Sequence, residues 1–362
     1  MNSLKKNRVF VDMHVIQSLP PSCVNRDDTG SPKTAVYGGV RRARVSSQAW
    51  KHAMRKMFKE YFDEIELSER TKKIVEKVAV QICLLKDSSM ENATTMAEDI
   101  IKHAGISIKD SEAKALFFMS NKQAENLAHM ALIDPLPGKK EVQEALNAGK
   151  GVDISLFGRM VADDPVLNSD ASAQVAHAIS THKVENEYDY YTAIDECSDD
   201  DQAGAGMIGT TEFNSSTLYR YATVAAHDLE KNLGDLNAAT KAIKEFVRAF
   251  ACSMPTGKQN TFANVTPPYA VMIAIRRDQP VNLVGAFESP VKESDAGYQK
   301  KSAEMLAKYA KLVYGKFLSA PENTFISAID DELAGLGETM EFAKLLEKTE
   351  QAVRKLLQEG GE

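Results

Sequence analysis

The stretch RVFVDMHVIQ, residues 8–17, has apolar side chains at alternate positions. Val9, Val11 and Val15 fall on one side of an extended chain, so the stretch predicts a β-strand with one face in a core. The next segment, residues 18–39, is rich in Pro, Gly, Ser and Asp and predicts a long loop. A loop of that length in a compact domain is typical of a functional or mobile segment.

A basic helix is predicted directly after this loop. Ser46 or Ser47 can accept a hydrogen bond from the first free amides and so cap its N-terminus. The helix has an apolar stripe at helical spacing, formed by Trp50, Met54, Met57, Phe58 and Tyr61. Lys51, Arg55 and Lys59 form a basic stripe beside it. Like charges at this spacing repel one another weakly, and a bound anion would reverse that effect.

The positive charge of the chain is concentrated around this helix. The sequence has 44 Lys and Arg against 51 Asp and Glu, a net charge of −7. Residues 41–59 contain seven Lys or Arg and no acid, so this window is +7 and the remainder −14. Such a patch can bind phosphates whatever the net charge. Nucleic-acid or polyphosphate binding is therefore the hypothesis, and a solvated helix face is the alternative.

Residues 63–165 predict a helical insertion, because amphipathic segments follow one another there without strand alternation. Near its end, Val152, Ile154 and Leu156 alternate and predict a short strand that Gly158 ends. We therefore expect a mostly helical unit between two parts of a mixed domain.

A long β-hairpin is predicted in the second half of the chain, after a short helix over 171–179. Its first strand is an aromatic stretch around Tyr190, and its second strand covers residues 213–226. The tip between them is rich in Gly and Asp and includes Asp199, Asp200 and Asp201.

The remaining elements complete an α+β domain. A helix over 236–252 is followed by strands over 269–277 and 281–288, and residues 291–362 predict two helical stretches. Without the insertion the order is β-α-β-β-α-β, the ferredoxin-like arrangement, whose sheet RNA-recognition modules also use. The RNP1 motif of standard RNA-recognition modules is absent.

Other constellations favour structural roles. Asp27 and Asp28 could bind a divalent metal for phosphodiester hydrolysis, but adjacent aspartates in turns commonly hydrogen-bond the nearby backbone. The histidines show no metal-ligand spacing, and the four cysteines form no zinc pattern.

No apolar run is long enough for a membrane helix, and no secretory signal is evident. We expect a cytoplasmic protein without a metal or other cofactor.

Six segments of the chain carry a family resemblance. In order, they are VDMHVIQSLPPSCVNRDD, YGGVRRARVSSQAWKHAMRK, GVDISLFGRMVA, AHAISTHKVENEYDYYTAIDE, GTTEFNSSTLYRYA and PTGKQNTFA. Together they resemble the CasC family, the repeated backbone subunits of the type I-E CRISPR surveillance complex Cascade. The resemblance spans about residues 8–290 and is weak in the tail.

The resemblance implies a modified ferredoxin-like (RRM-like) palm with an inserted helical fingers domain and a β-hairpin thumb. Residues 1–62 and 166–290 would form the palm, 63–165 the fingers, about 191–222 the thumb, and 291–362 a C-terminal helical segment packed on the palm. It also implies a non-catalytic subunit. Copies would stack along the CRISPR RNA, hold its phosphates and displace bases at regular intervals, so that the other bases can pair with target DNA.

The resemblance further implies a set of RNA-binding residues, namely Arg26, Arg41, Arg42, Ser46, Gln48, Lys51, Arg55, Met160, Ile208 and Lys258. Met160 matches an apolar wedge against the bases, a role suited to an unbranched, polarizable side chain. Ile208 matches an aliphatic residue of the thumb tip, and Lys258 lies in a loop that matches the family's GKQ segment. Val40 and His52 depart from the family, where a lysine and an arginine are usual.

The implied partners are CRISPR RNA, target DNA by way of the guide, neighbouring copies, and the companion subunits CasA, CasB, CasD and CasE, with no membrane. Two rival hypotheses remain open at this point. One is a metal-dependent RNase of a related CRISPR backbone type that uses Asp27 and Asp28, which Asp27→Ala/Asp28→Ala would test. The other is a non-CRISPR oligomeric protein with a basic interface helix, which the presence of companion subunits would exclude.

Overall fold

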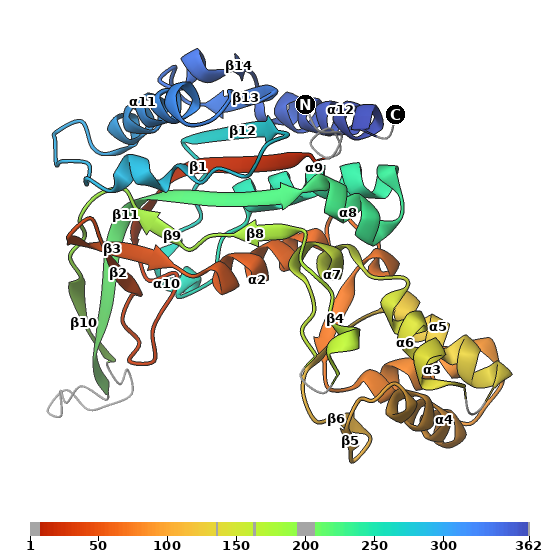
Figure 1. Cartoon of the computed structure of the whole chain (residues 1–362). Coiled ribbons are helices and arrows are strands. Elements are labelled where there is room, and N and C mark those ends of the chain that lie inside the picture. Colours follow the sequence, from red (N-terminus) through yellow and green to blue (C-terminus); the bar gives the residue numbers. More distant parts are fainter. Residues whose placement is uncertain (1–7, 135–136, 162–163, 194–206, 361–362) are drawn as a thin grey trace, which may run out of the picture.

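The computed structural model describes residues 8–134, 137–161, 164–193 and 207–360, which form an α+β structure (Figure 1). A ten-stranded sheet carries helices on both faces. A mostly helical unit lies at one end of the molecule, and a two-stranded arm projects from the other. Within these ranges, no helix is long and apolar enough to cross a membrane.

The centre of the sheet is a long antiparallel pair, β1 (Phe10–Ser22) and β11 (Met207–Ala225). The strand order is β14-β13-β12-β1-β11-β9-β3-β2, and β8 and β10 also pair with β11. The remaining strands of the sheet are β2 (Thr34–Tyr37), β3 (Val40–Val45), β8 (Ala173–Val175), β9 (Ala178–Ser180), β10 (Glu187–Ala193), β12 (Ala270–Arg276), β13 (Asn323–Ala328) and β14 (Glu338–Thr339).

The two faces of this sheet belong to two separate cores. Val11, Met13 and Val15 of β1 pack in a core with α2 (Ser47–Phe58) and α9 (Leu236–Cys252). Ile16 and Tyr219 belong to the core on the other face, under α11. The helices that complete these two cores are α8 (Ala226–Leu233), α11 (Gln299–Lys316) and α12 (Phe342–Gly360).

The predicted order of strands and helices in the sheet domain is present. Its second strand is formed by β8 and β9, not by residues 152–156. The chain runs β1, α2, then β8 and β9, then β11, α9 and β12. The neighbours in β12-β1-β11-β9 are all antiparallel, which agrees with the β-α-β-β-α-β order. The predicted strand over 8–17 and the helices starting near residues 46 and 236 are confirmed.

Residues 152–157 form a helix, α7 (Val152–Phe157), so the strand predicted there is wrong. All five positions from Val152 to Leu156 are buried. The alternation of apolar and polar residues therefore does not correspond to a strand with one buried and one exposed face. Gly158 ends the helix with φ 77°, a conformation that favours glycine.

The predicted helix over 171–179 is also wrong, because β8 and β9 occupy this segment and complete the sheet by pairing with β11. The predicted loop over 18–39 is partly strand. β1 extends to Ser22, and β2 pairs with β3 as a hairpin. β8, β9 and the end of β1 depend on β11, a partner distant in sequence that a local pattern does not contain.

The helical unit has its own core and contains short strands that the sequence pattern did not indicate. Its helices are α3 (Ile74–Leu85), α4 (Met90–His103), α5 (Asn121–Ile133) and α6 (Lys139–Asn147). Its strands are β4 (Ser68–Thr71), β5 (Ile108–Lys109), β6 (Glu112–Ala113) and β7 (Phe117–Ser120), paired as β4-β7 and β5-β6. Strands of two to four residues are too short to show a clear alternation.

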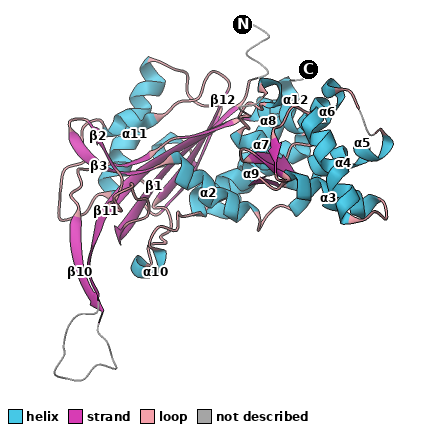
Figure 2. Ribbon diagram, turned by 90° about the horizontal axis from the view of Figure 1, so that it is seen from below, coloured by secondary structure: helices cyan, strands magenta, loops and turns pink. Residues whose placement is uncertain are grey.

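The predicted hairpin is present as β10 and the first part of β11 (Figure 2). Glu187 pairs with Phe213, and Ala193 pairs with Met207. The ladder is therefore displaced toward the N-terminus of the predicted range, and β11 continues from the arm into the central sheet. The tip, with Asp199–Asp201, lies outside the described residues.

The C-terminal segment contributes two strands as well as helices, since β13 pairs with β12 and β14 pairs with β13. Residues 283–287 form a short 3-10 helix instead of the predicted strand. The short helices of the chain are η1 (Glu64–Glu66), η2 (Pro165–Leu167), α10 (Gln259–Phe262), η3 (Leu283–Phe287) and η4 (Ala334–Leu336).

Candidate nucleic-acid interface

The N-terminus of α2 lies between the arm and the helical unit (Figure 2). Ser46 caps it as predicted, because its Oγ accepts a hydrogen bond from the Ala49 amide at 3.4 Å. Asn25 Oδ1 accepts a hydrogen bond from the Ser46 amide at 2.9 Å. The first turn contains no acid, and Gln48 is exposed there. The partial positive charge of this helix end is thus available to an anion.

Two loops bring Arg26 and Lys258 to the same end of the sheet. Arg26 follows Asn25, which holds Ser46, and is exposed. The loop of Lys258 packs so closely on the segment after β1 that a Cβ on Gly257 would lie 2.4 Å from the Val24 carbonyl oxygen. Lys258 Nζ donates a hydrogen bond to Thr211 Oγ1 at 3.1 Å, at the base of the arm. Residues distant in sequence therefore gather around the start of α2.

Lys51 extends this surface toward the helical unit. Its Nζ lies 5.5 Å from the centroid of the Phe157 ring. Burial lowers the pKa of the Lys51 ammonium, and the positive charge of Arg70 lowers it further. A bound anion would relieve this repulsion. Arg70 on β4 is exposed and was not predicted, and only the basic run of residues 70–73 could have indicated it.

Arg55 is engaged within the structure, and its assignment to RNA phosphates stays a prediction. Its Nε lies 3.0 Å from Asp153 Oδ2, and its Nη2 donates a hydrogen bond to the Ser68 carbonyl at 3.0 Å. Burial raises the pKa of the Asp153 carboxyl, and the Arg55 charge opposes this. Arg55 therefore joins α2 to α7 and β4.

Arg41 and Arg42 are adjacent, but only Arg41 is exposed. Arg42 is fully buried. Its Nη1 donates a hydrogen bond to the Ser180 carbonyl at 3.0 Å, and its Nη2 donates one to the Phe287 carbonyl at 2.8 Å. These contacts use the guanidinium inside the fold and do not support the prediction that Arg42 binds RNA, which stays untested. Arg42 ties β3 to β9 and η3.

Met160 is held in an exposed position by its neighbour. Its side chain is 86% exposed, whereas Arg159 is buried. Arg159 Nε donates a hydrogen bond to the Leu167 carbonyl at 2.9 Å, and the Arg159 backbone pairs with Ser169. The turn is therefore fixed, and Met160 is available for an apolar contact with another molecule.

The arm presents a second apolar surface. Ile208 is 63% exposed and lies opposite Thr192. Tyr188 and Tyr190 share its face, because side chains alternate along a strand. Both tyrosines are largely exposed. The sequence indicated an aromatic strand here but did not assign the tyrosines to the interface.

Asp27 has the turn role predicted for it. Its Oδ1 accepts hydrogen bonds from the Thr29 amide, the Thr29 hydroxyl and the Ser31 amide at 3.0, 2.7 and 3.0 Å. These bonds, above all the one from the hydroxyl, lower the pKa of the Asp27 carboxyl. Asp28 is exposed. Over the described ranges, no three His, Cys, Asp or Glu side chains are grouped to hold a metal.

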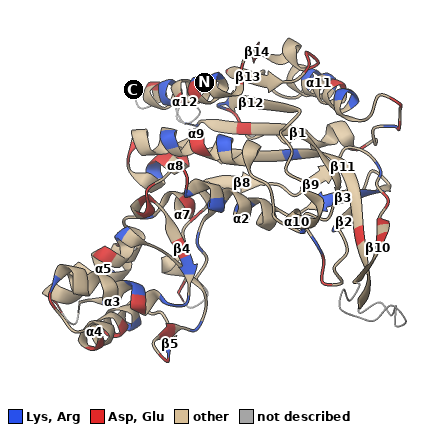
Figure 3. Ribbon diagram, turned by 180° about the vertical axis from the view of Figure 1, so that it is seen from behind, with Lys and Arg blue, Asp and Glu red and all other residues tan. Residues whose placement is uncertain are grey.

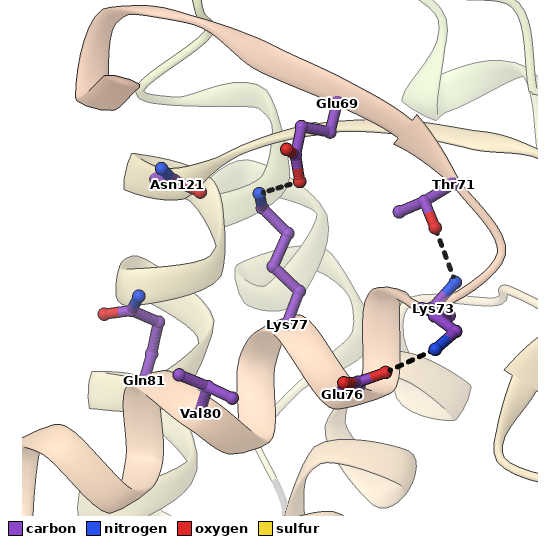
Figure 4. A pocket seen from close by; sticks show the side chains of 8 residues that line it. All are labelled: Glu69, Thr71, Lys73, Glu76, Lys77, Val80, Gln81 and Asn121. Carbon is purple, nitrogen blue, oxygen red and sulfur yellow. Dashed lines mark hydrogen bonds and ion pairs between the residues drawn. The ribbon is translucent and has the colours of Figure 1, made fainter. Parts of the chain in front are cut away.

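A surface hollow of about 310 Å³ between β4 and α3 is lined by charges of both signs (Figure 4). Lys77 Nζ lies 2.9 Å from Glu69 Oε2, and Lys73 Nζ lies 3.3 Å from Glu76 Oε2. Because each lysine faces a carboxylate, the hollow has no excess of positive charge. It is therefore a poor anion site compared with the start of α2.

Comparisons with known proteins agree with this arrangement. The chain matches the profile of a family described as CT1975-like protein over residues 11–352. A chain of a solved "CRISPR RNA-guided surveillance complex, pre-nicking" is 32% identical with a TM-score of 0.84, over 95% of this chain and 100% of that chain. A chain of a second CRISPR RNA-guided surveillance complex is 29% identical with a TM-score of 0.73, over 95% and 99%.

No curated protein sequence matches this chain. The family profile nevertheless extends over almost the whole sequence. The structural match likewise covers 95% of this chain. The chain therefore belongs to the CT1975-like family, the CasC backbone subunits of the type I-E CRISPR surveillance complex Cascade.

Proposed function

We propose that this backbone subunit polymerises along the CRISPR RNA and holds its phosphates without reading its sequence. Bases are displaced at regular intervals, and the others remain open to pair with target DNA in antiviral defence. The partners are neighbouring copies and the companion subunits CasA, CasB, CasD and CasE. As a member of this family the subunit is not an enzyme, and sequence reading is delegated to pairing between guide and target.

The observation that carries this proposal is the gathering of phosphate-binding groups around the start of α2. Arg26, Ser46 and Lys258 come from three distant segments and meet at one helix N-terminus. Gln48 and Lys51 extend the surface along the helix. Cations, hydroxyls and helix amides are the groups that contact nucleic-acid backbones, and such contacts carry no sequence information.

Two exposed apolar side chains support base displacement. Met160 stands on a fixed turn beside the helical unit, and Ile208 stands on the arm. Taking a base out of a stack costs a few kcal/mol, so contacts with apolar side chains must offset that cost. Tyr188 and Tyr190 enlarge the apolar surface of the arm.

In this proposal the sheet domain, the helical unit and the arm correspond to the palm, fingers and thumb of the family. The central sheet with α2 and α9 is a modified ferredoxin-like, RRM-like palm. The helical unit forms the fingers, and the β10–β11 arm forms the thumb that reaches a neighbouring copy. The antiparallel order β12-β1-β11-β9 supports the palm assignment.

Co-purification tests the RNA face. The chain is expressed with its companion subunits and a CRISPR RNA, and the complex is analysed by size exclusion and by the ratio of absorbance at 260 and 280 nm. Arg26→Ala/Lys51→Ala should reduce the RNA held and the yield of the large complex. Lys344→Ala/Lys355→Ala on α12 removes the same charge far from α2 and should leave both unchanged.

Equal RNA content in both double variants would contradict the assignment of the α2 face. Arg55 is not used in this test, because its ion pair with Asp153 would confuse a loss of binding with a loss of structure.

A further inference from the structure

Helix α11 presents a basic stripe on the side of the sheet opposite to α2. Its inner positions, Ala303, Leu306 and Ala310, are buried in the second core. Its outer positions follow the spacing i, i+3, i+4, i+7 and i+8, which defines one helix face. They are Lys308, Lys311, Leu312, Gly315 and Lys316, all exposed. In Figure 3, α11 lies at the edge of the molecule and carries blue Lys and Arg positions along its length.

The charge of α11 is opposite to that of the chain. The helix contains five lysines and one glutamate, a charge of +4, so the remaining residues of the −7 chain carry −11. Lys300 pairs with Glu332 at 3.4 Å and Lys301 with Glu304 at 3.0 Å. For Lys308, Lys311 and Lys316, the described part of the chain provides no ion-pair partner within 4.0 Å.

Apolar side chains accompany these lysines at the end of the helix. Phe317 is 82% exposed and Leu312 is 45% exposed, and both adjoin Lys316. An exposed aromatic ring beside cations is the combination that binds single-stranded nucleic acid, because the ring stacks on a base while the cations contact phosphates.

The α11 stripe cannot serve the same phosphates as α2. The two helices belong to different cores, with the central sheet between them. RNA held at the start of α2 is therefore out of reach of Lys308 and Lys311. A polyanion bound to this face would therefore be separate from that RNA.

We propose that the outer face of α11 binds the phosphodiester backbone of DNA that lies outside the guide pairing, with Phe317 stacking on an unpaired base. This goes beyond the proposed function, and it rests on that function only for the placement of RNA on the α2 face. The contact is independent of sequence, so it adds affinity for DNA without changing which target the guide selects.

The test uses the assembled complex with its CRISPR RNA. The variant Lys308→Gln/Lys311→Gln/Lys316→Gln is compared with Lys344→Gln/Lys348→Gln/Lys355→Gln on α12, which removes the same charge. The probes are a fluorescent DNA duplex and a single strand, both without a match to the guide. Their binding is measured by anisotropy at several salt concentrations.

The α11 triple variant should bind both DNAs more weakly, and the slope of log K against log salt should become shallower by about 1 per lysine. Phe317→Ala should lower the affinity for the single strand by about tenfold and leave the affinity for the duplex unchanged, since only an unpaired base can stack on the ring. The α12 variant should match the unmodified complex in both respects.

Unchanged affinity and slope in the α11 variant would overturn the proposal. Loss of assembly or RNA in that variant would also overturn it and would make α11 an interface between subunits. The RNA content of the Arg26→Ala/Lys51→Ala complex tests the proposed function separately, so failure of one can be distinguished from failure of the other.

Discussion

Lys51 and Arg55 lie one helical turn apart on α2, yet their surroundings differ. Lys51 has no carboxylate partner at hydrogen-bond distance among the described residues, whereas Arg55 binds Asp153, whose side chain is only 3% exposed. Removing one member of a buried ion pair leaves the other charge buried without compensation. The two cations therefore have different roles despite their common stripe.

Arg55→Met should lower the free energy of unfolding by about 3 kcal/mol, because Asp153 would lose its partner. Lys51→Met should change it by less than about 1 kcal/mol. Urea denaturation followed by circular dichroism measures both. If Arg55→Met/Asp153→Leu does not recover part of the loss, the ion pair is not its cause.

Two buried groups on β1 make the stability depend on pH in opposite directions. Burial, followed by the charge of Arg276, lowers the pKa of His14 from 6.5 to about 3. The stability from neutral His14 is complete above pH 6.5 and is lost as the pH falls toward 3. Burial raises the pKa of Asp12 to about 6, so its contribution is present below pH 3.8 and is lost as the pH rises through 6.

His14→Gln should remove the first of these dependences. At pH 4.5, two units below the pKa of His14 in the unfolded chain, the buried histidine should lower the free energy of unfolding of the wild type by about 2 to 3 kcal/mol relative to pH 7. The variant should therefore lose less stability than the wild type between pH 7 and pH 4.5 in urea denaturation. His52→Gln alters a surface histidine and serves as the control. Parallel losses in the wild type and His14→Gln would contradict a neutral buried His14.

The interface could be predicted from the sequence residue by residue only in part. The cap at Ser46 and the exposure of Arg26, Gln48, Met160 and Ile208 agree with expectation. The burial of Arg42 was not expected, because the direction of its side chain follows from the pairing of β3 with β9. Such pairing joins segments more than a hundred residues apart, and no local pattern contains it.

At the scale of elements, long segments with one buried face were predictable, and short segments buried on all sides were not. The helix over 236–252 has a clear apolar stripe and was found at its observed bounds. The six residues of α7 are nearly all buried, so hydrophobic periodicity cannot separate helix from strand there. β8 and β9 are three residues each and exist through their long-range pairing.

The turn after α7 depends on glycine. Gly158 has φ 77°, and a Cβ there would lie 2.8 Å from the Ser169 carbonyl oxygen. Gly158→Ala should lower the free energy of unfolding by about 1 to 3 kcal/mol. Gly315→Ala is a matched control, since its Cβ would meet nothing within 4 Å and alanine favours a helix. Urea denaturation of both variants checks this, and equal effects would contradict the strain at Gly158.

At the scale of the molecule, the helical unit has a core of its own and is joined to the sheet domain through more than one segment of the chain. Its core shares no residue with the two cores of the sheet. Its two ends meet, because a Cβ on Gly151 would lie 3.0 Å from the Leu67 carbonyl carbon. The chain thus leaves and re-enters the sheet domain at neighbouring points. Residues beyond Gly151 also pack on the helical unit, because Val161 and Leu167 belong to its core and Arg159 Nη1 donates a hydrogen bond to the Phe118 carbonyl at 3.2 Å.

Excision of residues 68–150, with Leu67 joined to Gly151 through a short Gly-Ser linker, should leave the sheet domain folded if Arg159, Val161 and Leu167 are also replaced by serine. These three side chains pack on the helical unit and would otherwise lose their partners. The shortened protein should keep a single cooperative urea transition and the far-ultraviolet dichroism of a mixed α/β domain, since α2, α9, α11 and α12 remain. Its denaturant m-value should fall by roughly a quarter, since m scales with the surface exposed on unfolding and 83 of 362 residues are removed. A broad, non-cooperative transition would show instead that the sheet needs the helical unit. In that case Arg55, which contacts Ser68 at the junction, would be the first residue to suspect, because the excision removes that hydrogen bond.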